Sequence, residues 1–165
     1  MANLKGNMSL KFRKTTVDEI VLIHDFYFLS PEPDAPKARF ESLSPQEQNA
    51  VFLQYPVESY LSVINENEVI GFMGFFPDDD LNVNIFCVIS PENRKKGFFS
   101  KILSLSIDYC RHNFSDFLYI RALTRKENCA SVEGLKRSSF IRKGEVIEEV
   151  QPNVSYEEYI YPIKS

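Results

Sequence analysis

The segment between residues 60 and 89 constrains the fold of this chain more than any other part of the sequence. Apolar residues gather there in three short runs, at 60–64, 69–76 and 81–89, with polar turns at 65–67 and 78–80 between them. This pattern predicts an antiparallel meander of three strands. In the third run Leu81, Val83, Ile85, Cys87 and Ile89 share one face, and Asn82, Asn84, Phe86 and Val88 share the other.

The residues before this meander predict one strand followed by two helices. Leu10 and Phe12 alternate with basic residues as in a short strand, and Thr15-Thr16-x-x-Glu19 is typical of a helix N-terminus. Ser44-Pro45-x-Glu47 predicts the start of a second helix, with proline in its first turn. The proline-rich residues 30–37 predict a loop, which either borders a substrate pocket or is a plain connector.

The residues after the meander predict two helices and three further strands. Ser90-Pro91 ends the third strand, and apolar or small residues at helical spacing predict a helix over 95–112. A nearly continuous apolar run predicts a central strand at 117–123. The remaining expected elements are a short helix at 128–137 and strands at 140–150 and 155–163. This order of strands and helices predicts a mixed α/β fold with a single sheet.

The composition is that of one soluble globular domain covering residues 1–165. Of the 165 residues 44% are hydrophobic and 25% charged, and no stretch approaches the roughly 18 apolar residues of a membrane-spanning helix. A formal net charge of −4 and a pI near 5.3 argue against a nucleic-acid partner. Residues 1–10 lack the apolar core of a signal peptide, so we expect a cytoplasmic protein with no membrane partner.

The residues that commonly bind metals are scattered. Cys87, Cys110 and Cys129 are widely spaced and form no CxxC pair, which argues against a disulfide framework and a structural zinc site. His24 and His112 are isolated and belong to no metal-binding motif. We therefore predict no metal site.

The junction after the third strand of the meander carries the clearest chemical signal. A buried strand turns into a helix here, and Arg94, Lys95, Lys96 and Gly97 occupy the junction. A helix N-terminus presents unpaired backbone N–H groups and the positive end of the helix dipole, and a glycine lets an anion approach the backbone. From these residues alone, the junction is either a phosphate or pyrophosphate site or a solvated basic turn.

This junction resembles the acetyl-coenzyme A (acetyl-CoA) signature of the Gcn5-related N-acetyltransferase family. That signature reads Arg or Gln, two residues, Gly, one residue, and then Gly or Ala. The sequence matches it at Arg94 and Gly97 and departs from it at Phe99, whose bulky ring must turn toward the core.

Two nearby patterns and the order of elements extend the resemblance over residues 8–163. Ile89-x-Pro91 resembles the strand end of the family, and Asn128-x-x-Ser131 followed by Phe140 resembles its second cofactor segment. The resemblance implies an α+β acyl-CoA N-acyltransferase fold. In that fold a single mixed, mostly antiparallel sheet is flanked by helices, and its central strands splay apart.

The resemblance also implies which residues bind acetyl-CoA. The backbone of Val88 and Ile89 would bind the pantetheine arm where the strand at 81–89 splays from the strand at 117–123. Asn128 and Ser131 would contact the arm or a phosphate from the opposite side, unless Asn128 is only a helix N-cap and Ser131 a small packing residue. The pyrophosphate would lie on the backbone amides of Lys95, Lys96, Gly97, Phe98, Phe99 and Ser100, with Arg94 placing the turn.

The sequence assigns no catalytic side chain. By the resemblance, a backbone N–H of Val88 or Ile89 would stabilise the oxyanion. The family commonly has a tyrosine as proton donor where this sequence has Leu135, so another hydroxyl or water protonates the thiolate, or the protein is a weak or inactive catalyst. Tyr119 and Tyr156 lie on strands that could face the cleft, although aromatic residues in central strands more often pack.

The general base is equally open. Glu41, His24 and the aspartate turn at 78–80 are conceivable bases, and a solvated turn is the more common use of three adjacent aspartates.

The resemblance predicts an acetyl-CoA-dependent N-acetyltransferase that moves an acetyl group to a primary amine of a small molecule or peptide by direct attack on the thioester. Leu135 and Phe99 favour an alternative, a non-catalytic acyl-CoA-binding sensor or interaction module with the same fold. A third hypothesis is a structural protein that pairs with a second copy through an exposed strand edge at 156–163. The family also implies a possible homodimer, and the acidic composition slightly favours cationic amines.

Overall fold

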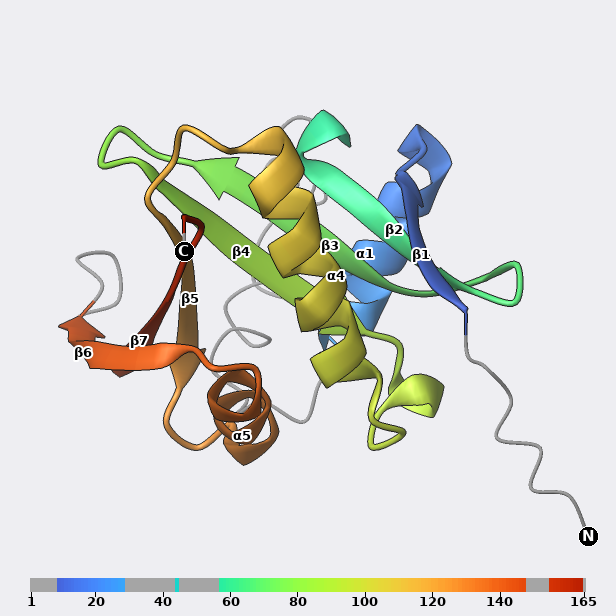
Figure 1. Cartoon of the computed structure of the whole chain (residues 1–165). Helices are drawn as coiled ribbons and strands as arrows, with labels where there is room; N and C mark the ends of the chain where they lie inside the picture. The colour runs from blue at the N-terminus through green and yellow to red at the C-terminus, as the bar shows by residue number, and fades with distance from the viewer. Residues whose placement is uncertain (1–8, 29–43, 45–56, 148–154, 165) are drawn as a thin grey trace, which may run out of the picture.

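The computed structural model describes residues 9–28, 44, 57–147 and 155–164, whose strands form one seven-stranded sheet (Figure 1). The strands are β1 (Leu10–Lys14), β2 (Tyr60–Asn65), β3 (Glu68–Pro77), β4 (Asn82–Ile89), β5 (Tyr119–Arg125), β6 (Ile141–Ile147) and β7 (Ser155–Pro162). They lie in the order β1-β2-β3-β4-β5-β7-β6. All neighbours are antiparallel except β4 and β5, so the predicted mixed, mostly antiparallel sheet is confirmed.

Helices cover both faces of the sheet (Figure 1). They are α1 (Ile20–Phe28), α4 (Phe98–Asn113) and α5 (Cys129–Arg137), with short 3-10 turns η1 (Val17–Glu19), η2 (Val57–Ser59) and η3 (Pro91–Asn93). Helices α4 and α5 pack on one face, and α1 packs on the other. Within the described ranges, no helix has both the length and the apolar character needed to cross a membrane.

Each face of the sheet has its own apolar cluster. The larger one joins α4 and α5 to the sheet and includes Ile102, Leu103, Leu135, Ile120 and Tyr159. The smaller one joins Ile23 of α1 to Tyr60, Phe72 and Val88. Because β4 contributes Val83 to the first cluster and Val88 to the second, the predicted division of its side chains between two faces is confirmed.

Strands β4 and β5 pair over three residues only and then separate. Their register runs from Asn82 opposite Tyr119 to Asn84 opposite Arg121. A polar network holds them together at this end, because Arg121 donates to Asn84 Oδ1 (3.2 Å) and to Glu158 Oε1 (2.5 Å). The predicted splay of the central strands is therefore present, and it begins just past Asn84.

The predicted N-terminal elements are confirmed as far as the structure describes them. Strand β1 pairs with β2, and the Glu19 carboxylate accepts the Thr16 backbone N–H (3.1 Å) as the capping pattern requires. The predicted loop at 30–37 and the helix predicted from Pro45 lie outside the described residues.

The predicted starts of α4, β4 and β5 were wrong, each for a local reason. Helix α4 begins at Phe98 rather than at residue 95, because Lys95 and Gly97 have left-handed backbones, with φ of 60° and 77°. Leu81 was assigned to a strand, but its φ of 61° places it in the preceding turn, where it is exposed. Strand β5 begins at Tyr119 rather than at residue 117, because the Phe117 N–H closes a turn onto Phe114 O (3.0 Å).

The strand expected to offer a free edge is covered on both sides. Strand β7, at residues 155–162, pairs with β5 along one edge and with β6 along the other. The hypothesis that two copies pair through an exposed strand edge is therefore wrong for residues 156–160, which have partner strands on both sides.

Candidate functional site

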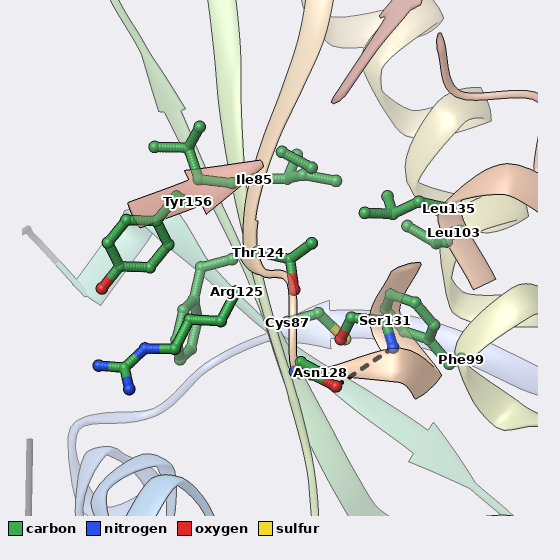
Figure 2. A pocket seen from close by; sticks show the side chains of 13 residues that line it. Ile85, Cys87, Phe99, Leu103, Thr124, Arg125, Asn128, Ser131, Leu135 and Tyr156 are labelled. Carbon is green, nitrogen blue, oxygen red and sulfur yellow. Dashed lines mark hydrogen bonds between the residues drawn. The ribbon is translucent and has the colours of Figure 1, made fainter. Parts of the chain in front are cut away.

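A pocket lies where β4 and β5 separate (Figure 2). It offers about 210 Å³ to water-sized molecules. Its walls come from β4 and β5, from α4 and α5, and from the start of β7. The lining residues are Ile85, Phe86, Cys87, Phe99, Leu103, Ala122, Leu123, Thr124, Arg125, Asn128, Ser131, Leu135 and Tyr156. The separation of two paired strands thus produces a slot that reaches both faces of the sheet.

The N-terminus of α4 lies beside this gap and is open to an anion. Gly97 occupies the N-cap position, and no side chain caps the first turn that Phe98, Phe99 and Ser100 begin. A Cβ added to Gly97 would meet no atom within 4 Å, so there is open space beside this residue. The amides of Lys95 and Lys96 belong to the turn before the helix. This open N-terminus fits a phosphate group.

Arg94 ties the end of β4 to α1. Its Nε donates to Ile89 O (2.9 Å), and its Nη2 donates to Phe26 O (2.7 Å). These bonds fix the turn that leads into α4, which agrees with the expectation that Arg94 places the turn.

The backbone of β4 presents alternate residues to the gap. The Ser90 N–H donates to Ile70 O of β3 (2.9 Å), and in an antiparallel ladder every second residue points the same way. The N–H of Val88 therefore faces β3, whereas those of Cys87 and Ile89 face the gap. Of the expected pair Val88 and Ile89, it is Ile89 whose N–H is turned toward a ligand in the gap.

Asn128 caps α5 at the opposite wall of the pocket. Its side-chain oxygen accepts the Ser131 N–H (3.3 Å), so the N-cap interpretation of Asn128 is confirmed. Both residues also line the pocket. Capping and ligand contact are compatible, because the cap holds the side chain at the pocket wall.

The Phe99 ring turns inward and packs on α5, as its bulk required. It lies against Gly134, where an added Cβ would overlap the ring. The ring also lines the pocket, so a glycine on one helix makes room for an aromatic residue on the other.

Leu135 places an apolar side chain in the pocket wall. It is 2% exposed and belongs to the larger apolar cluster. The hydroxyl groups that line the pocket belong instead to Thr124, Ser131 and Tyr156. Tyr119 lies at the other end of β5, opposite Asn82, and does not line the pocket.

Cys87 also lines the pocket, and burial raises the pKa of its thiol to about 12 although the residue as a whole is half-buried. The group is therefore a neutral thiol at physiological pH.

The aspartate turn at 78–80, one of the candidate bases, does not line the pocket. Asp78 accepts the backbone N–H groups of Asp80 and Asn82, so the aspartate turn is stabilised by its own side chain. Burial acts to raise the pKa of Asp78, but hydrogen bonds from Asn82 and Asn84 outweigh it and hold this pKa below its ordinary value. Glu41 and the side chain of His24 lie outside the described residues.

Arg125 is the pocket residue that the sequence analysis missed. The predicted strand stopped at Leu123 and left Arg125 outside it, but β5 continues to Arg125 and pairs it with Tyr156. The alternation of Arg121, Leu123 and Arg125 was the available signal, since residues two apart share a strand face.

Comparisons with known proteins agree with this geometry. The model of the acetyltransferase (GNAT) family matches residues 19–139, well over half of the chain. No curated protein sequence matches significantly.

The solved structures similar to this one include several acetyltransferases. A chimera of spermidine N-acetyltransferase SpeG from Vibrio cholerae with hSSAT has a TM-score of 0.73 at 16% identity, covering 93% of this chain and 95% of the other. A GNAT-family acetyltransferase from Bacillus anthracis has a TM-score of 0.69 at 20% identity, covering 94% and 95%. The Vibrio cholerae spermidine N-acetyltransferase in complex with CoA and spermine has a TM-score of 0.69 at 16% identity, covering 93% and 95%. At these identities the likeness shows the shared fold.

Proposed function

We propose that this chain, which belongs to the acetyltransferase (GNAT) family and is an N-acetyltransferase, moves an acetyl group from acetyl-CoA to a primary amine of a small molecule or peptide. The observation that carries the proposal is the pocket between β4 and β5, which lies beside an uncapped helix N-terminus. Bound acetyl-CoA supplies an acetyl thioester as the electrophile for an amine.

Residues on both sides of the gap would hold the donor. The backbone N–H groups of the turn and helix start, from Lys95 to Ser100, would bind the pyrophosphate, with Arg94 fixing the turn. The free edge of β4 at Cys87 and Ile89 would hydrogen-bond the pantetheine arm, with Val88 supporting the strand. Asn128 and Ser131 would contact the arm from α5.

The Ile89 N–H is our candidate for polarising the thioester carbonyl. Val88 donates toward β3, whereas Ile89 faces the gap, and the bond from Arg94 to Ile89 O fixes the peptide that follows Ile89. A fixed donor stabilises developing negative charge at no cost of reorganisation.

Proton transfer at this site would not require a hydroxyl at residue 135. The departing thiol has a pKa near that of cysteine, about 8.5, so its thiolate is an acceptable leaving group. Thr124, Ser131 and Tyr156 supply hydroxyl groups along the pocket, and water can also reach it. We expect one of these sources to protonate the thiolate.

A non-catalytic acyl-CoA-binding module is the second candidate. The buried, apolar Leu135 favours it, since the pocket wall has no hydroxyl there. Both candidates would bind acetyl-CoA, but only the enzyme would transfer its acetyl group.

Thermal unfolding with and without acetyl-CoA tests the binding site that both candidates share. At about 100 times its Kd a ligand adds roughly 2.7 kcal/mol, which corresponds to a rise of about 5 to 10 °C in Tm for a domain of this size. Free CoA should act similarly, whereas ATP and NAD at equal concentration should not. A rise common to all four ligands, or no rise, would count against the site.

Gly97→Val supplies the matching variant. Valine would add bulk at the N-cap of α4 and strain a backbone whose φ is 77°, so the acetyl-CoA shift should disappear. Gly144→Val is the control, because Gly144 on β6 also has open space and lies outside the site. Release of CoA with an amine panel, lost in the Gly97 variant and kept in the Gly144 variant, would separate the enzyme from the binding module.

A further inference from the structure

Arg125 is a buried cation with an unsatisfied donor. The residue is 8% exposed, and its Nη2 is buried with no hydrogen-bond partner in the part of the chain that the structure describes. Its one defined contact among the described residues is with the Tyr156 ring, whose centroid lies 5.9 Å from the guanidinium carbon. Arg121 lies four residues earlier on the same strand face and has both Glu158 and Asn84 as partners.

An arginine in this position calls for an anion. A guanidinium stays protonated in proteins, and a buried charge is costly unless it is paired and hydrogen-bonded. An aromatic face satisfies only part of this requirement, because it offers no acceptor in the plane of the N–H groups. A carboxylate matches the planar fork of the guanidinium with two parallel hydrogen bonds.

The side chain lies on the sheet face opposite α4. Arg121 bonds to Asn84, whose face of β4 also carries Phe86 and Val88 of the cluster under α1, and Arg125 shares the face of Arg121. Figure 2 shows Arg125 and Tyr156 on one side of β5, with Phe99, Leu103 and Leu135 on the other.

This placement separates the donor side of the pocket from a second side. The N-terminus of α4 and the N-cap of α5 lie on the donor side of the pocket. An amine acceptor therefore approaches the gap from the other face, where Arg125 lies. The anion that Arg125 needs would then belong to the acceptor.

We infer that the acceptor is an amino acid or a similar amine that carries a carboxylate, and that Arg125 binds this carboxylate with Tyr156 covering the guanidinium. The inference rests on the proposed function and adds the class of acceptor to it. It replaces the expectation of a purely cationic amine, which came from net charge alone. A phosphonate is also an anion, but it is tetrahedral and can carry a second negative charge, so it serves as a comparison.

Matched acceptor pairs test the inference without any mutation. CoA release would be measured with L-phenylalanine against phenethylamine, L-methionine against 3-(methylthio)propylamine, and L-lysine against cadaverine, with aminoalkyl phosphonates of similar size as a further arm. We expect at least one amino acid to react, with kcat/KM about 100-fold or more above that of its decarboxylated partner. Decarboxylated amines that react as well as the amino acids would overturn the inference, and a phosphonate preferred to its carboxylate would overturn the choice of carboxylate.

Variants of Arg125 locate the effect. Arg125→Met should raise KM for the amino acid about 100-fold and so remove the preference for the amino acid over its decarboxylated partner. Arg125→Lys should give a KM for the amino acid between that of the wild-type protein and that of Arg125→Met, because lysine keeps the charge but loses the planar fork of N–H donors. Arg137→Met, at the exposed end of α5, is the control and should change none of these values. An unchanged preference in Arg125→Met would overturn the inference.

A binding measurement separates this inference from the proposed function. With free CoA present, the amino acids that react should raise the Tm of the wild-type protein more than they raise the Tm of Arg125→Lys. If no acceptor of any class reacts but this Arg125-dependent shift is found, the proposed activity fails and the carboxylate site stands. If neither reaction nor binding of any amino acid depends on Arg125, the inference fails, whatever acetyl-CoA does.

Discussion

Burial sets the chemical state of the cysteines. Burial raises the pKa of both Cys87 and Cys110 to about 12, and Cys129 is exposed at the start of α5. Thiol reagents attack the thiolate, so the two buried groups are unreactive at neutral pH even though Cys87 lines the pocket.

We therefore predict that one thiol in three reacts rapidly in the native protein. A chromogenic disulfide at pH 7.5 should give one fast equivalent, from Cys129, and the other two only on unfolding. Cys129→Ser should abolish the fast phase. A second fast equivalent in the wild-type protein that disappears on adding CoA would show instead that Cys87 is a reactive thiolate.

Part of the site was visible in single residues of the sequence. Gly97 next to basic residues indicated an anion site because a helix start needs no special tertiary context to bind one. Arg125 was missed because its importance depends on where β5 ends and on Tyr156, far away in the sequence. Long-range register of this kind is not contained in local spacing.

At the scale of elements, α4 and α5 depend on each other at one contact. The Phe99 ring fills the space above Gly134, and both helices line the same pocket. Any side chain at residue 134 must displace the ring, and the open direction is toward the pocket.

Gly134→Ala should therefore weaken cofactor binding more than it weakens the fold. Overpacking typically costs about 1–3 kcal/mol, offset in part by the higher helix propensity of alanine. We expect Kd for CoA, measured by calorimetry, to rise about tenfold or more. Glu133→Ala, exposed on the same helix, is the control. Equal CoA affinity in both variants would mean that the ring moves elsewhere.

Elements were easier to predict than their ends. Alternation and helical spacing identified every described strand and helix, because those patterns record which face is buried. The ends at Gly97 and Leu81 were missed because a left-handed residue interrupts a helix or strand without altering the apolar pattern.

For the molecule as a whole, several paired carboxylates make stability dependent on pH. The hydrogen bond from Tyr159 holds the pKa of Glu157 below its ordinary 4.5 against the opposing effect of burial, with Arg142 assisting. Burial likewise opposes the lowering at Glu19, where bonds from Arg13, Thr16 and Ser62 prevail. A carboxyl group with a depressed pKa in the folded state stabilises the fold above its ordinary pKa, and this contribution is lost as pH falls below that value.

The free energy of unfolding should accordingly be lower at pH 3.5 than at pH 7 in urea titrations. Glu157→Gln should cost stability at pH 7 and less at pH 3.5, because below the ordinary pKa of the carboxyl group the unfolded wild-type chain binds a proton and the advantage of the native carboxylate shrinks. Glu133→Gln, which changes an exposed ion pair on α5, should have the same small effect on the free energy of unfolding at both pH values. A Glu157→Gln penalty equal at both pH values would rule out the pKa shift as its cause.

The short pairing of β4 with β5 has a mechanical consequence. One half of the sheet consists of β1 to β4 and the other of β5 to β7. In the described part of the chain they are joined by three residue pairs, by the Arg121 network and by the bond from the Leu118 N–H to Leu81 O (2.8 Å). A molecule bound in the pocket beyond these contacts touches both halves of the sheet and restricts their bending relative to each other. Tighter binding of the acyl donor would then also make the protein stiffer, because the bound donor would connect the two halves of the sheet where the strands do not pair.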